Sequence, residues 1–168
     1  IGTLEMILEG FVHGFTWSFL GPIYDGIAFV QDYLHPIVFL AVVYGFYRRL
    51  VLKPKRLGSD WEHMKDGLLV LTLTGMLMLA NIFSFGGFVL GGHHLGHAEF
   101  RPVSQMVANF LGSMGVSAEE GVSLGYFCWA LHLSVVMFFA AYIPNSKHLH
   151  VVAAGPNIFF SRQKARGT

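Results

Sequence analysis

The stretch that decides the fold is 67–88, "GLLVLTLTGMLMLANIFSFGGF", which contains no charged residue. The uncharged region extends from Asp66 to His93. A helix of about 20 apolar residues rises ~30 Å, which is the thickness of the hydrocarbon core of a bilayer. The stretch therefore predicts a membrane-spanning helix.

Two further segments on either side are long enough to cross a bilayer. Residues 121–146 are uncharged apart from a possible charge on His132, whereas residues 27–47 contain Asp32, His35 and Pro36 in their first half. If that helix began at Pro36, only about twelve apolar residues would precede Arg48, too few to span. We expect it to begin upstream and to bend at Pro36, because membrane helices tolerate proline. The prediction is an all-α membrane bundle with helices at about 26–47, 67–88 and 121–146.

Composition supports a membrane protein and excludes several other classes. Hydrophobic residues make up 54% of the 168 residues and charged residues 12%, against ~25% charged in soluble domains. A single cysteine, Cys128, cannot by itself hold an iron–sulfur cluster or form a disulfide within the chain. The sequence has no glycine-rich phosphate loop, no nucleophile motif and no basic face for nucleic acid. It opens on "IGTLEMILEG", which resembles the end of an apolar helix, so we expect a fragment of a longer chain.

The basic residues predict how the bundle is oriented. Of the eleven Lys and Arg residues, only Arg101 lies between the second and third spans. The positive-inside rule then places 48–65 and 147–168 in the cytoplasm, and 1–25 and 89–120 outside. In the outer loop, Ser104 is expected to cap a short surface helix, "QMVANFL".

His132 and His35 are the first candidate ligands. An ionisable side chain in hydrocarbon is costly, so His132 is either a neutral imidazole bonded to a neighbouring helix or an axial ligand of haem iron. His35 lies thirteen residues before Arg48, ~20 Å above the inner surface, and His132 lies fifteen before Lys147, ~22 Å above it. Two histidines at one depth could bind one iron from opposite sides. Alternatively, His35 makes a polar contact near the start of its helix.

Three other histidines lie near the predicted inner surface. His150 follows His132 by eighteen residues, or five helical turns, and shares its face if the helix continues in register past Pro144. His148 then points elsewhere. Alternatively, both are solvated at the inner surface. His63 is more typical of a surface residue than of a ligand.

The outer loop contains the histidine-rich stretch "GGHHLGHAE" at 91–99. His93 and His97 would share one face of a helix and could bind zinc or copper. The flanking glycines disfavour a helix, so a solvated loop is the favoured interpretation.

Two family resemblances bear on these histidines. The segment 132–150, "HLSVVMFFAAYIPNSKHLH", resembles the last transmembrane helix of the nitrate reductase gamma-subunit family of b-type cytochromes. The segment 142–160, "YIPNSKHLHVVAAGPNIFF", is more similar to the membrane domain fused to iron–sulfur oxidoreductases related to heterodisulfide reductase. Some of these link electron-transfer flavoprotein to menaquinone. "RPVS", "FYRR" and "MKDGLLVL" are also similar to that domain.

The resemblance implies a function and a set of ligands. His132 would bind an outer haem b and His150 an inner one, giving one or two haems that pass electrons between membrane quinone and an iron–sulfur protein or fused domain in the cytoplasm. The chain would be the cytochrome b part of a quinone-linked oxidoreductase, multi-pass in a prokaryotic inner membrane, with lipid around it and no cluster of its own.

The sequence also departs from the gamma-subunit pattern. Gamma subunits carry two histidines ten residues apart on an early helix, and no such pair occurs here, so at least one opposing ligand is expected outside this sequence. The alternative function is a non-redox scaffold or transporter subunit in which histidines are polar contacts between helices.

Overall fold

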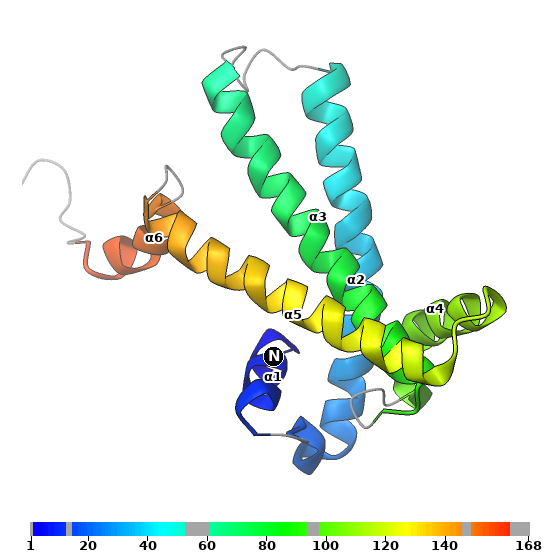
Figure 1. Cartoon of the computed structure of the whole chain (residues 1–168). Helices are drawn as coiled ribbons and strands as arrows, with labels where there is room; N and C mark the ends of the chain where they lie inside the picture. The colour runs from blue at the N-terminus through cyan, green and yellow to red at the C-terminus, as the bar shows by residue number, and fades with distance from the viewer. Residues whose placement is uncertain (1, 13–14, 53–60, 94–97, 146–148, 162–168) are drawn as a thin grey trace, which may run out of the picture. The chain divides into compact units, whose positions relative to one another are not determined.

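The computed structural model describes residues 2–12, 15–52, 61–93, 98–145 and 149–161, and all regular elements in these ranges are helical. The chain divides into two compact units, 1–135 and 136–168. The elements are α1 (Gly2–Phe11), η1 (Trp17–Leu20), α2 (Pro22–Tyr47), η2 (Arg48–Leu52), α3 (Trp61–Leu90), η5 (Ala98–Phe100), α4 (Pro102–Ser113), α5 (Ala118–Tyr142), η6 (Ile143–Asn145) and α6 (Leu149–Phe159) (Figure 1).

The three predicted long helices are confirmed. Segments Pro22–Leu52, Met64–Leu90 and Ala118–Asn145 are long and apolar enough to cross a membrane. α2 continues through Pro36, as predicted, because a membrane helix can lose one backbone hydrogen bond where neighbouring helices support it. α2 and α3 run side by side, and α4 packs against both (Figure 1).

α3 and α5 approach each other closely through glycines. A Cβ atom on Gly87 would lie 2.4 Å from the carbonyl oxygen of Gly121 and 3.0 Å from the nitrogen of Gly125. The Ser84 hydroxyl donates a hydrogen bond of 2.9 Å to the Gly125 carbonyl across the same crossing. Small residues permit this spacing, and in lipid such close packing is a main source of helix association.

α4 begins before the residue that was predicted to cap it. The helix starts at Pro102, with Ser104 already inside it. Asp32 of α2 accepts hydrogen bonds from the backbone N–H groups of Val103, at 2.6 Å, and Ser104, at 3.2 Å, and from the Ser104 hydroxyl. The prediction that Ser104 is the cap is therefore wrong. A carboxylate from a neighbouring helix satisfies the free N–H groups and complements the helix dipole instead.

α4 is also more buried than a surface helix. Ser104, Ala108 and Leu111 are buried on one face, while Met106 and Phe110 are exposed on another. The helix is thus half in the protein interior.

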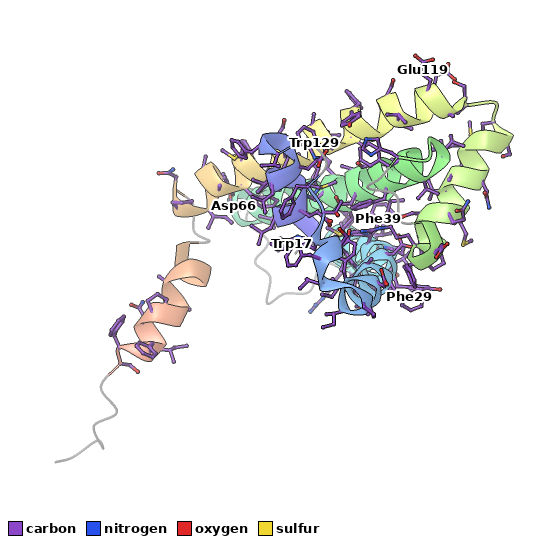
Figure 2. All side chains as sticks on the ribbon, turned by 90° about the horizontal axis from the view of Figure 1, so that it is seen from below. Trp17, Phe29, Phe39, Asp66, Glu119 and Trp129 are labelled. Carbon is purple, nitrogen blue, oxygen red and sulfur yellow. The ribbon has the colours of Figure 1, made fainter. Side chains whose placement is uncertain are left out.

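α1 packs against both α2 and α5. The Trp129 indole N–H of α5 donates a hydrogen bond of 3.1 Å to the Met6 carbonyl, and Figure 2 shows Trp129 beside α1. A Cβ atom on Gly10 would lie 3.1 Å from the Trp129 ring. These contacts place the buried face of α1 in the interior of the first unit.

The third long helix ends earlier than predicted. α5 ends at Tyr142, the 3₁₀ turn η6 follows, and α6 begins at Leu149. Pro144 lacks an N–H and clashes with the preceding turn, and the Asn145 amide donates to the Ala141 carbonyl at 2.9 Å. The eighteen residues from His132 to His150 therefore do not run along one continuous α-helix, so the spacing no longer assigns a face to His150.

Candidate functional site

Buried polar side chains from α1 to α5, together with Arg101 just before α4, lie in the interior of the first unit. Burial of polar groups is costly unless they find partners, so such a group marks a specific arrangement. We call it the polar cluster. Its members are each at most 6% exposed: Glu5, Tyr24, Asp32, His35, Asn81, Arg101, Ser104 and His132.

His132 lies on α5 and is 2% exposed. Its Nε2 is 3.4 Å from the Thr3 hydroxyl oxygen, and its Nδ1 is 3.4 Å from the Leu77 carbonyl oxygen. Both distances are longer than the usual 2.7–3.2 Å. The imidazole is therefore buried with only weak polar partners.

His35 lies on α2 in the same cluster. Its Nε2 is 3.3 Å from the Asn81 amide nitrogen, and its ring is nearly parallel to that of Phe85, with 6.2 Å between ring centroids. His35 contacts Asn81 and His132 contacts the Leu77 carbonyl, and these two residues lie one turn apart on α3. The two histidines that the depth count placed at one level thus belong to one interior site.

Arg101 is the cluster residue that sequence reasoning missed. It is fully buried, and its guanidinium carbon lies 3.9 Å from the centroid of the Phe85 ring, a cation–π contact. None of its three side-chain nitrogens has a partner within hydrogen-bond geometry among the residues that the structure describes, and its neighbour in the cluster is the Tyr24 side chain. The one available signal was its isolation as the single basic residue of the predicted outer loop.

Glu5 on α1 is a second unpredicted member. Its Oε1 accepts a hydrogen bond of 2.6 Å from the Tyr24 hydroxyl and a longer one, 3.4 Å, from the backbone N–H of Trp17. Its Oε2 has no partner within the described ranges. Glu9, one turn further along, is also buried, at 2% exposure. Two glutamates four residues apart in an apolar segment share a helical face, which was the signal for this site.

His93 is held in the first unit by aromatic neighbours. Its Nε2 lies 2.9 Å from the Tyr126 hydroxyl, and its ring stacks on Phe88 with centroids 4.8 Å apart. His97 lies outside the described residues. In the described part of the chain, no group of three or more His, Cys, Asp or Glu residues could hold a metal ion, so a zinc or copper site at His93 and His97 stays a prediction.

The remaining predicted ligands are not among the side chains that the structure describes. His63 is in the first turn of α3 and His150 is the second residue of α6, whereas His148 falls outside the described residues. Their roles as ligands stay predictions.

Comparison with known proteins gives one informative similarity. No family model and no solved structure matches the chain. It is 30% identical over 166 residues to the "probable iron-sulfur-binding oxidoreductase FadF" of Bacillus subtilis (strain 168). The match covers 99% of this chain but 22% of that protein, so the chain spans about a fifth of its relative's length. Along nearly its whole length, this all-helical chain is therefore related to part of an oxidoreductase.

Proposed function

We propose that this chain is the haem b-binding membrane part of an oxidoreductase that transfers electrons between an iron–sulfur partner and a membrane quinone. The observation that carries the proposal is the burial of His35 and His132 in one site, on two different helices of membrane-spanning length. The iron–sulfur binding named for the Bacillus subtilis relative supports a partner, or a further domain, of that kind.

The chemistry of the two histidines fits a haem. Neutral imidazole nitrogen is the usual protein ligand of b-type haem iron. The present contacts of the ring nitrogens, 3.3–3.4 Å long, are weak, so replacing them with a stronger ligand bond costs little. His132 and His35 would hold the iron of one haem, and His150 would hold the iron of a second.

The chain's own residues would set the properties of this centre. Haem supplies one-electron transfer at iron when bound. His35 and His132 would hold it, the ring of Phe85 would help to exclude water, and the charges of Asp32 and Arg101 would act on its potential. In the proposed orientation, α4 and the polar cluster lie towards the outer surface, and the basic segments 48–65 and 147–168 lie on the cytoplasmic side in reach of the iron–sulfur partner.

A visible spectrum tests the proposal directly. The dithionite-reduced minus oxidised spectrum of the purified protein should show b-type haem bands, and pyridine extraction should release haem. His132→Ala should lose one haem because no other imidazole of α5 can replace it. His93→Ala is the matched control, a histidine packed on Phe88 and Tyr126, and should retain full haem content. A colourless protein would favour the scaffold alternative, in which the contacts of His132 to Thr3 and Leu77 are its whole role.

A further inference from the structure

Several buried polar atoms of the polar cluster have no partner. They are Nε, Nη1 and Nη2 of Arg101, Oε2 of Glu5 and Oδ1 of Asn81, counted over the described ranges. An unpaired charged group in a water-poor interior is costly. Arg101 is fully buried, so solvent at the protein surface does not supply the missing acceptor. This concentration of unsatisfied groups indicates a binding site.

We infer that Arg101 and Glu5 bind the head group of the quinone, with Arg101 donating hydrogen bonds to a quinone oxygen and Glu5 exchanging its protons. This inference rests on the proposed function, because it assigns the place where the quinone of that function reacts.

The charge balance of the cluster favours a neutral acceptor at Arg101. Arginine only donates hydrogen bonds, through a planar fork of N–H groups, so its ligand must present an oxygen. The buried cluster already contains the carboxyl groups of Glu5 and Asp32, with Glu9 buried on the same helix as Glu5, against the single guanidinium. An anionic ligand would lie among these acidic side chains, whereas a quinone carbonyl carries no charge.

The surroundings of Arg101 suit an electron-transfer site. Phe85 contacts the guanidinium through its ring face and lies nearly parallel to the His35 ring. One aromatic side chain therefore connects Arg101 to a proposed haem ligand. A quinone bound at Arg101 would be next to the redox centre of the proposed function.

Glu5 is placed to handle the protons. Reduction of a quinone consumes two electrons and two protons and forms two O–H bonds, and quinol oxidation releases the same numbers. The iron–sulfur partner donates or accepts the electrons. Glu5 has one oxygen without a partner and the other bonded to the Tyr24 hydroxyl, and Tyr24 in turn lies close enough to Arg101 for electrostatic interaction. Its carboxyl group would carry the protons one at a time between quinone and water.

Titration with a fluorescent quinone analogue, heptyl-hydroxyquinoline N-oxide, tests the binding step on the purified, haem-loaded protein. Loss of a charged hydrogen bond corresponds to a change of about 10- to 100-fold in affinity. We expect weakening in this range for Arg101→Gln and about tenfold for Arg101→Lys, which keeps the charge but not the fork. Arg49→Gln, in η2, is the control and should bind as the unmodified protein does. Unchanged affinity in both Arg101 variants, with intact haem spectra, would overturn the inference.

Glu5→Gln separates proton exchange from binding. It should bind the analogue within about twofold of the unmodified protein, because Gln keeps the size and the acceptor oxygen for Tyr24. Its quinone turnover should fall at least about tenfold, and the pH profile of turnover should change shape. If the rate of quinone turnover and its pH profile are both unaltered, Glu5 does not exchange protons with the quinone.

Photolabelling uses the unmodified protein, so its result does not depend on whether variants of buried residues fold. An azidoquinone should label peptides that contain residues 2–11 or 98–113. Labelling confined to 147–168 would contradict the site. If the protein contains no haem and does not react with quinone, the proposed function itself fails, which is a different result from a haem protein whose quinone site lies elsewhere.

Discussion

The two halves of α2 differ in what they bury, although both are apolar enough to lie in a membrane. Four of its five buried residues, Tyr24, Ala28, Asp32 and His35, lie in the first fourteen positions, and only Val42 is buried later. Beyond residue 36 the exposed large side chains include Leu40, Val43, Tyr44 and Tyr47. In lipid an exposed apolar side chain costs nothing, whereas a polar one must find a protein partner. Both halves of α2 therefore expose apolar side chains, but the polar residues that it buries all lie in the first half.

The largest expected effect comes from separating the helices at the packed end. Gly87→Leu would place side-chain atoms where even a Cβ lies 2.4 Å from a backbone oxygen of Gly121. We expect a loss of about 3 kcal/mol or more in stability, the upper part of the range for overpacking. The measurement is the yield and thermal unfolding midpoint of the detergent-solubilised protein.

Gly26→Leu is the matched control on α2, since a Cβ there meets no atom within 4 Å. This variant should not change the yield or the thermal unfolding midpoint. If both variants behaved alike, the close α3–α5 crossing would not be what holds the packed end together.

Asp32→Ala should have the next largest effect. It removes the acceptor for the N–H groups of Val103 and Ser104 at the start of α4, leaving buried donors unsatisfied at a cost of about 1–3 kcal/mol. Hydrogen exchange of the first turn of α4 should accelerate. Asp32→Asn, which keeps an acceptor oxygen, should lose less. Equal protection of α4 in the Ala variant and the unmodified protein would show that the helix needs no cap from α2.

Phe85→Leu tests the aromatic contact inside the polar cluster. It removes the ring face under the Arg101 guanidinium and beside His35, with an expected loss of about 1–2 kcal/mol. Under the proposed function, the midpoint potential of the haem should also change. Phe29→Leu is the control, at a side chain that is 47% exposed. It should change neither the stability nor the midpoint potential. A loss of stability with an unchanged potential would make Phe85 a packing residue only.

The smallest effect is expected in the second half of α2. Val43 is 48% exposed, and Val43→Ala should change the unfolding midpoint by the equivalent of at most about 0.5 kcal/mol. A larger loss would show that a partner or another part of the protein covers this face. The second half of α2 would then also be packed, and the difference between its two halves would hold only in the absence of that covering element.

The long helices could be predicted from sequence with few errors, because a run of apolar residues long enough to span hydrocarbon has one stable backbone conformation there. Predictions made from neighbouring residues in the sequence failed where a side chain from another helix makes the hydrogen bond instead. Ser104 has the residue type of a cap, yet Asp32, 72 positions away, caps α4. Pro144 interrupts the third helix, whereas Pro36 does not interrupt the first, although the residue type is the same.

By itself, the sequence determined that this chain forms three membrane-length helices, and that its polar residues between them must be buried in protein, since hydrocarbon offers them no partners. For most of those residues, the tertiary structure decided which ones lie close together. His35 and His132 were predictable as a pair because depth follows from a count along each helix, at ~1.5 Å per residue. Arg101 and Glu5 were not, because each lies outside the long helices, and only the packing of α1 and α4 against those helices buries both residues in the interior.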